Sequence, residues 1–242
     1  MSDAYWDAFF ELHRDLPREG PGEDADVAWA AEIADLKPDA RICDAACGPG
    51  ADIAALRRVA PQGHVDALDK VAGFVEQARA RQGDDRNVTL SVADMSDITG
   101  PYDMIWCAGA LYFLGVTEGL RRWREALGPG GVVAFSQVCW FTKDRPKAAV
   151  DLWADYPEMT DVAGVAACVE AAGYTTLATR KISDHAWEDY YGPLDQRIAK
   201  LSPGASGALT QVLEEARTEA AVWRAHRESF GYLLSVVRPN AV

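Results

Sequence analysis

Short apolar runs alternate with helical patterns through the first 140 residues, and this alternation constrains the fold more than any other feature. The apolar runs are typical of buried strands and lie at residues 41–45, 64–68, 88–92, 102–107 and 132–138. Strands joined through helices form a parallel sheet with helices on both faces and right-handed crossovers. We therefore expect an α/β, doubly wound fold.

Further helical and strand patterns complete the expected element order. The predicted helices cover residues 3–16, 26–36, 51–59, 71–82, 116–127, 162–172, 209–223 and an aromatic-rich stretch within 184–201. Two more strands are predicted at residues 174–182 and 230–237, and residues 142–160 are predicted to be irregular. Gly and Pro clusters at residues 17–22 and 128–131 predict turns.

The composition excludes several classes of protein. The chain has 242 residues, of which 49% are apolar, so it suits one globular domain. Its 24 Lys and Arg against 37 Asp and Glu give a net charge of −13, which argues against a nucleic-acid partner because phosphate binding needs clustered cations. No apolar run approaches the roughly 18 residues of a membrane span, so we expect no membrane contact.

The cysteines point to a reducing compartment. All five fall within apolar stretches, at Cys43, Cys47, Cys107, Cys139 and Cys168. Their odd number and their spacing fit neither a disulfide scaffold nor a zinc site. We therefore expect reduced, buried thiols and a cytoplasmic protein.

Ligand-type residues follow three consecutive predicted strands. The segment 44–50, Asp-Ala-Ala-Cys-Gly-Pro-Gly, links the first strand to a helix, and its glycines allow close backbone approach to a ligand. Asp69, at the second strand end, can accept hydrogen bonds from both ribose hydroxyls. Asp94 follows the third strand and can accept from an adenine amino group, with Met95 against the ring. The combination predicts a nucleoside-type ligand.

These residues resemble the class I S-adenosylmethionine-dependent methyltransferases. The family pattern is Asp-x-Gly-x-Gly-x-Gly after the first strand and an acid after each of the next two. The chain matches it at Asp44, Gly48, Gly50, Asp69 and Asp94. It departs from the pattern at the first glycine, where Ala46 stands. The motifs cover about residues 25–140.

Within that family, the chain most resembles small-molecule methyltransferases of the methyltransferase-11/25 type. The residues that carry this likeness are Gly20-Pro21-Gly22 after the N-terminal helix and the late Tyr190-Tyr191-Gly192-Pro193. The resemblance implies a Rossmann-like seven-stranded sheet in the order 3-2-1-4-5-7-6 with the last strand antiparallel. It also implies S-adenosylmethionine as cofactor, S-adenosylhomocysteine as product, a small-molecule substrate and no metal.

The resemblance divides a single domain, residues 1–242, into functional segments. These are an N-terminal lid helix at 1–24, a cofactor-binding core at 25–140, a cap insertion with the sixth strand at 141–204, and the last helix and strand at 205–242. The expected cofactor-binding residues are Asp44, Ala46, Cys47, Gly48, Gly50, Asp69, Lys70, Asp94, Met95 and Ala108. The aromatic-rich insertion offers a contact for a homodimer.

Aromatic side chains are the candidates for the substrate walls, because acceptors bind beyond the strand ends. We expect Tyr112, Trp140, Tyr190, Tyr191, Trp6 and Phe10 to form them, although each also fits an ordinary core position. Methyl transfer is an in-line displacement in which alignment supplies about 7 kcal/mol or more, so no catalytic side chain is obligatory. If the acceptor must lose a proton, His185 is the first candidate base and His13 the second.

Two other functions remain open at this point. A non-catalytic protein that binds the cofactor, or a scaffold, fits the same motifs. A nicotinamide-dependent oxidoreductase fits less well, because Ile53 breaks its Gly-x-Gly-x-x-Gly pattern and no Tyr-x-x-x-Lys occurs. Residues 107–110, Cys-Ala-Gly-Ala, lack the Asn/Asp-Pro-Pro-Tyr of enzymes that methylate exocyclic base amines. A magnesium-assisted mechanism lacks an obvious ligand there.

Overall fold

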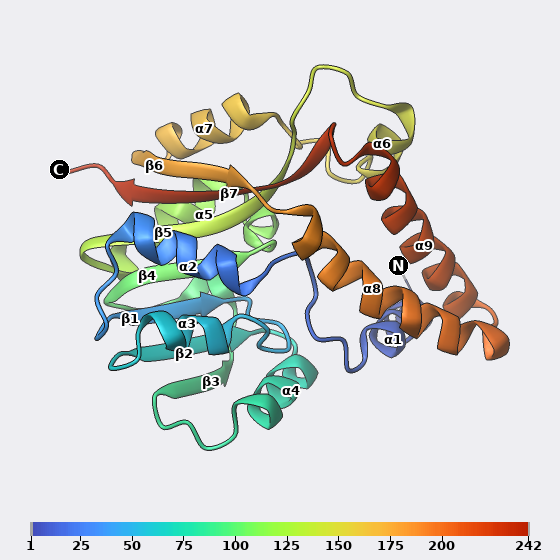
Figure 1. Ribbon diagram of the computed structural model, residues 1–242, viewed down its shortest axis with the longest axis horizontal. Coiled ribbons are helices and arrows are strands. Elements are labelled where there is room, and N and C mark those ends of the chain that lie inside the picture. The colour runs from blue at the N-terminus through green and yellow to red at the C-terminus, as the bar shows by residue number, and fades with distance from the viewer. Residues whose placement is uncertain (1, 242) are drawn as a thin grey trace.

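The structure, a computed structural model, describes residues 2–241 and contains one seven-stranded sheet in the order β3-β2-β1-β4-β5-β7-β6 (Figure 1). Its strands are β1 (Arg41–Ala45), β2 (His64–Asp69), β3 (Val88–Val92), β4 (Tyr102–Ala108), β5 (Leu127–Trp140), β6 (Tyr174–Lys181) and β7 (Phe230–Pro239). Strands β1 to β5 pair in parallel, and β7 runs antiparallel to both β5 and β6. The predicted fold class, strand order and antiparallel last strand are confirmed.

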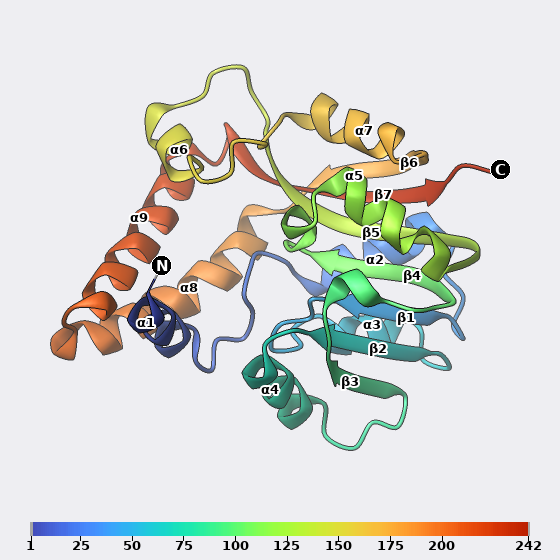
Figure 2. The ribbon, with the colours of Figure 1, turned by 180° about the vertical axis from the view of Figure 1, so that it is seen from behind.

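Two apolar clusters, one on each face, hold the sheet between its helices. Successive side chains of a strand point to opposite faces, so in β4 Met104 and Trp106 join one cluster while Ile105 and Cys107 join the other. Helices α2 (Asp24–Ala34) and α3 (Ile53–Val59) cover the first face, and α5 (Val116–Trp123) and α7 (Val162–Ala171) the second (Figures 1 and 2). Helix α4 (Ala72–Gln82) packs beside β2 and β3.

A group of helices stands beyond the carboxyl ends of the parallel strands. It consists of α1 (Asp3–His13), α8 (Asp184–Leu201) and α9 (Ala208–His226), with the short α6 (Lys147–Leu152) beside α9 (Figures 1 and 2). Trp187 and Trp223 stack with ring centroids 4.9 Å apart and join α8 to α9. Helix α1 contacts both α8 and α9, so segments from the two ends of the chain form one cap. Among residues 2–241, no helix has the length and apolarity needed to span a membrane.

Two local predictions were wrong. Residues 142–160 are not wholly irregular, since they contain α6, which follows Pro146. Residues 128–131 do not form a turn ahead of the fifth strand, because β5 already begins at Leu127. The pairing with β4 shifts there, from Tyr102 opposite Leu127 to Met104 opposite Val132, so the glycines form an irregularity inside the strand.

Candidate active site

The loop after β1 turns through three residues with positive φ. They are Ala46 (60°), Gly48 (54°) and Gly50 (82°). A Cβ at Gly50 would lie 2.9 Å from Cβ of Ala78 on α4, so only glycine fits there. Ala46 adopts the left-handed conformation despite its Cβ, which costs about 1 kcal/mol or more. The loop therefore has the backbone that its Gly-rich motif predicts, including the position where alanine replaces glycine.

Asp69 at the end of β2 fastens this loop. Its Oδ2 accepts from Gly48 N at 3.0 Å, and its Oδ1 accepts from Val71 N at 2.8 Å. The backbone N–H of Cys47 also donates to the carbonyl of Leu68 at 2.9 Å. Each carboxylate oxygen of Asp69 keeps a further lone pair, which a ribose hydroxyl can use. The buried Asp69 thus orders the loop and remains able to accept from a ligand.

The end of β3 presents a different environment. Asp94 is exposed, and its carboxylate accepts from Ser96 N at 2.8 Å, which lowers the pKa of Asp94. Met95 is buried, and its carbonyl accepts from Trp123 Nε1 at 2.7 Å. Lys70 is exposed with Nζ 5.4 Å from the ring centroid of Phe113. The three sequence-predicted residues Lys70, Asp94 and Met95 therefore lie at neighbouring strand ends.

Asp44, at the end of β1, has a buried carboxyl oxygen without a partner in the described part of the chain. It is only 3% exposed, and its Oδ2 has no hydrogen-bond partner among residues 2–241. Burial, followed by the charges of Asp52 and Asp69, raises the pKa of Asp44 well above its usual value. An orphaned buried carboxylate oxygen of this kind suits a cationic or hydrogen-bond-donating ligand. Ala108, half-buried at the end of β4, precedes Gly109, whose N–H donates to Ser136 Oγ at 2.8 Å.

The segment after α1 lies over the glycine loop. A Cβ built on Gly48 would lie 3.4 Å from Cγ of Glu19, so the Glu19 side chain covers this glycine. Glu19 Oε2 lies 2.6 Å from His13 Nδ1, and the His13 ring stacks on Phe9 with centroids 4.0 Å apart. Oε1 of Glu19 is buried without a partner within residues 2–241. Burial is the main cause that raises the pKa of Glu19, and the charge of Asp69 adds to it.

An ion pair anchors the same segment to the core. Arg18 Nη2 donates to Asp52 Oδ1 at 2.6 Å, and Trp106 Nε1 of β4 donates to Asp52 Oδ2 at 2.9 Å. Arg81 of α4 adds hydrogen bonds to the carbonyls of Leu16 at 2.6 Å and Pro49 at 3.1 Å. The N-terminal segment is therefore held against the loop by Asp52, which precedes α3, and by Arg81 of α4.

Five tyrosines gather between the strand ends and the cap, and we call them the tyrosine cluster: Tyr112, Tyr156, Tyr190, Tyr191 and Tyr232. The ring centroids of Tyr112 and Tyr156 are 5.6 Å apart, and those of Tyr190 and Tyr191 are 5.1 Å apart. A Cβ on Gly109 would lie 3.1 Å from the Tyr232 ring, so the cluster reaches the end of β4. The hydroxyl of Tyr191 donates to Glu219 Oε1 at 3.0 Å.

The central part of the chain matches a known protein family. Residues 42–131 match the family described as a methyltransferase domain. These residues form a methyltransferase domain. They include the glycine loop, Asp69 and Asp94, so the resemblance predicted from the motifs is confirmed.

The whole chain shares its fold with a solved methyltransferase. It is similar to the SAM-dependent methyltransferase from Geobacter sulfurreducens, solved in complex with S-adenosyl-L-homocysteine, with 18% identity, a TM-score of 0.81 and coverage of 97% of this chain and 98% of that chain. At this identity the likeness shows the fold. The fold therefore extends beyond the matched methyltransferase domain to the cap helices.

The matches to curated relatives cover only part of each relative's length. The chain is 26% identical over 184 residues, 74% of its length, to an uncharacterised 37.1 kDa transposon protein from Streptomyces fradiae. It is 30% identical over 130 residues, 53% of its length, to the malonyl-[acyl-carrier protein] O-methyltransferase of Enterobacter lignolyticus. The chain spans 46% of the first and 49% of the second, so it covers about half the length of these relatives.

The structure does not bring all the predicted substrate-wall residues together. Tyr190 and Tyr191 belong to the tyrosine cluster with Tyr112. Trp140 is buried in the core, with its ring 5.9 Å from that of Phe230. Trp6 and Phe10 are exposed on α1, and the Phe10 ring lies 6.1 Å from Phe74 of α4.

The two candidate histidines differ sharply in surroundings. His13 is buried and contacts Glu19, whose side chain covers Gly48 of the loop. The His185 side chain is 74% exposed at the start of α8, with Nδ1 3.3 Å from Asp189 and 3.5 Å from Glu23. It lines an open depression with Gly50, Arg18 and Arg81 on the outer side of the loop. The structure therefore brings His13, and not His185, to the tyrosine cluster and loop.

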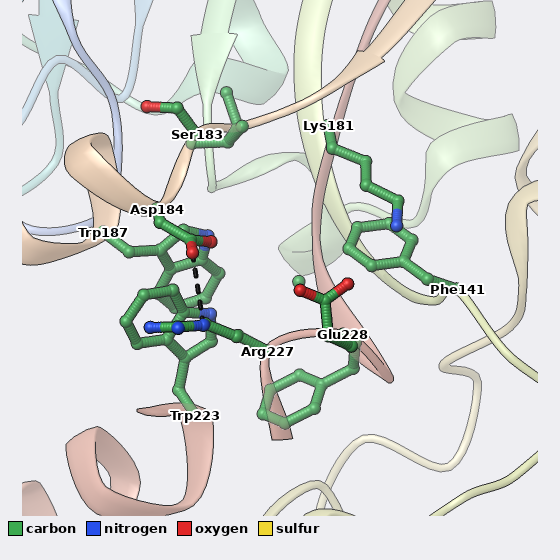
Figure 3. A pocket seen from close by; sticks show the side chains of 11 residues that line it. Phe141, Lys181, Ser183, Asp184, Trp187, Trp223, Arg227 and Glu228 are labelled. Carbon is green, nitrogen blue, oxygen red and sulfur yellow. Dashed lines mark ion pairs between the residues drawn. The ribbon is translucent and has the colours of Figure 1, made fainter. Parts of the chain in front are cut away.

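A smaller hollow of about 260 Å³ lies elsewhere, where β6, α8, α9 and β7 meet (Figure 3). Lys181, Arg227 and Glu228 face it, and Arg227 Nε pairs with Asp184 at 3.2 Å. No residue predicted for the site lines it. Within residues 2–241, no group of three or more His, Cys, Asp or Glu side chains is arranged to hold a metal ion.

Sequence reasoning missed three acidic residues that shape the site: Glu19, Asp52 and Glu219. Glu19 and Asp52 carry no motif, since their partners lie in distant segments. Glu219 had a usable signal, because it continues the apolar stripe of Val212, Ala216 and Trp223 at helical spacing. A carboxylate on the buried stripe of a helix indicates a paired or ligand-facing group.

Proposed function

We propose that the protein is an S-adenosylmethionine-dependent methyltransferase that acts on a small-molecule acceptor. The observation that carries this proposal is that the ends of β1 and β2 meet at one loop, where Asp44 keeps an orphaned buried oxygen and Asp69 keeps free lone pairs. A cofactor with ribose hydroxyls and an ammonium group complements both carboxylates. When bound, it supplies an electrophilic methyl group on a sulfonium centre.

The chain's own residues hold such a cofactor by hydrogen bonding and charge. Asp69 accepts from the ribose, and Asp94 with Met95 takes the adenine. Asp44 and the buried Oε1 of Glu19 face the positively charged amino-acid end, since both are unpaired carboxylate oxygens next to the glycine loop. Backbone amides at the positive-φ turn complete the cradle.

The acceptor side is formed by the tyrosine cluster. It lies beside Gly109 at the end of β4, where residues of α8, β7 and the turn at residues 111–113 meet. Aromatic walls exclude water and align the acceptor for in-line displacement, so the protein acts mainly through positioning. His13, held by Glu19, is the buried imidazole available to accept a proton.

Cofactor binding tests the first part of the proposal. Adding S-adenosylhomocysteine should raise the melting temperature by mass action, and NAD should leave it unchanged. Isothermal calorimetry should then give one binding site per chain. A shift with NAD and none with S-adenosylhomocysteine would contradict the proposal.

Turnover separates an enzyme from a protein that only binds the cofactor. The measurement follows transfer of a labelled methyl group to a panel of amine, hydroxyl, thiol and carbon acceptors. Cofactor binding without transfer to any acceptor would favour the non-catalytic alternative.

A further inference from the structure

Glu219 lies inside the cap without a cationic partner. Its Oε1 accepts the Tyr191 hydroxyl, and its Oε2 makes no hydrogen bond to another residue within 2–241. The side chain of Glu219 is half-buried. Its Oε2 is not fully buried, so this oxygen retains some exposed surface. Burial is the main cause that raises the pKa of Glu219. Buried carboxylates are normally paired, and this one lacks a pairing group of its own.

The tyrosine cluster surrounds this carboxylate. Burial and the neighbouring charge of Glu219 raise the pKa of Tyr112 to about 12, and they also raise the pKa of Tyr190, Tyr191 and Tyr232. Three hydroxyls of the cluster make no hydrogen bond to another side chain within residues 2–241, and each retains some exposed surface. They belong to Tyr112, Tyr190 and Tyr232. Four tyrosines and one carboxylate therefore line the same space.

The imidazole that lies near Glu219 is already engaged elsewhere. It belongs to His13, whose Nδ1 is held by Glu19 at 2.6 Å. Glu19 in turn has one oxygen buried without a partner. Glu19 and Glu219 thus lie near one imidazole, and the region beside the glycine loop holds more acidic than basic side chains. That excess favours a cation and repels an anion.

We infer that the Glu219 carboxylate and the surrounding tyrosines select an acceptor that carries a cationic nitrogen, so the substrate class is an amine or ammonium compound. This inference rests on the proposed function and names the substrate for the same site. A cation gains both an ion pair with Glu219 and the π-faces of tyrosines. A carboxylate-bearing acceptor would meet Glu219 and Glu19 as like charges, and a neutral alcohol would leave Glu219 unpaired.

Binding to the protein saturated with S-adenosylhomocysteine tests the inference. The probes are three compounds of matched size: phenethylamine, 2-phenylethanol and 3-phenylpropionate. Calorimetry should show that the amine binds about tenfold or more tightly than the alcohol, and that the acid binds most weakly. The same order should appear in KM for any of them that is methylated.

Glu219→Gln should remove the preference for the amine, with Kd for phenethylamine rising about tenfold or more and Kd for S-adenosylhomocysteine unchanged. Glu214→Gln is the matched control, because Glu214 lies on the same helix but is exposed and pairs with Arg217. It should behave as the wild type. Melting curves check that each variant is folded, and Glu219→Asp should restore part of the preference.

Three outcomes would overturn the inference. They are a wild type that prefers the alcohol or the acid, a wild type that binds none of these probes, and a Glu219→Gln variant that keeps the amine preference. Failure of the protein to bind S-adenosylhomocysteine would instead defeat the proposed function. The first binding measurement therefore separates the two failures.

Discussion

Arg18 and Asp52 form a buried ion pair, with Nη2 and Oδ1 2.6 Å apart, between the N-terminal segment and the start of α3. Both side chains are only 11% exposed, and Trp106 supplies a second donor to Asp52. Taking two charges out of water is costly, so the pair is stable only while both partners and the Trp106 hydrogen bond are present. It fixes the segment that carries Glu19, whose side chain covers Gly48 of the loop.

Arg18→Ala should lower the free energy of unfolding by about 3 kcal/mol, because it leaves the Asp52 carboxylate buried without its counterion. Urea denaturation of the purified variant measures the loss. Arg14→Ala is the control, since Arg14 is exposed and its pair with Glu11 should contribute less than about 1 kcal/mol. Adding Asp52→Asn to Arg18→Ala should recover part of the loss, because the amide oxygen still accepts from Trp106. A loss for Arg18→Ala as small as that of the control would contradict this account.

Ala46→Gly should raise the free energy of unfolding by about 0.5–1 kcal/mol. Ala46 has a φ of 60°, so glycine relieves strain that exceeds the entropy it adds to the unfolded chain. Ala54→Gly, at an exposed position of α3, should instead lower stability by about 1 kcal/mol. The same chemical change is thus expected to have opposite signs at two sites eight residues apart, and equal signs in denaturation curves would argue against strain at Ala46.

Asp69→Ala should weaken binding of S-adenosylhomocysteine by about 1–3 kcal/mol, which calorimetry measures directly. The change removes the ribose acceptor and also frees the N–H groups of Gly48 and Val71. Asp97→Ala, at an exposed carboxylate near the same strand ends, serves as control and should leave Kd unchanged. Equal affinities for Asp69→Ala and the wild type would show that Asp69 does not hold the cofactor.

The sequence was enough to predict the sheet and the positions of Asp44, Asp69 and Asp94. Strand periodicity and the parallel topology together bring consecutive strand ends to one edge of the sheet, so residues at those ends meet whatever their separation in the chain. The same reasoning could not place the N-terminal segment. Arg18 reaches Asp52 only because of the path that residues 14–23 take across the loop, and no periodicity encodes that path.

The cap shows the same limit. Tyr190 and Tyr191 were predicted to line the site because they are aromatic residues of the cap insertion, but Tyr232 was assigned only to the last strand. Its ring reaches Gly109 because β7 lies next to β5, which depends on an antiparallel pairing of distant segments. His185 illustrates the converse: an imidazole next to aromatic residues in sequence points to solvent, because the first turn of α8 exposes that face.

Glu219 gives the protein a pH-dependent stability whose sign follows from its raised pKa. The unfolded carboxyl loses its proton near pH 4.5, whereas the folded one keeps it to a higher pH. Between these two values the folded state binds more protons than the unfolded state, so stability falls as pH rises through this window. The groups facing Glu219 do not reverse this sign: Tyr191 and His13 lower the pKa of Glu219, but burial outweighs them, and Tyr112, Tyr190 and Tyr232 titrate in a more alkaline range.

Glu219→Gln should therefore be more stable than the wild type at pH 7 and nearly equal to it at pH 4, because glutamine does not titrate. The difference between the two proteins should grow with pH by about 1.4 kcal/mol for each unit by which the folded pKa exceeds 4.5. Urea denaturation of both proteins at intervals between pH 4 and pH 8, without ligand, measures it. Glu214→Gln should show no such growth, since Glu214 is exposed. A Glu219→Gln variant that loses stability relative to the wild type as pH rises would mean that a positive charge pairs with Glu219, and the amine preference would then lose its physical basis.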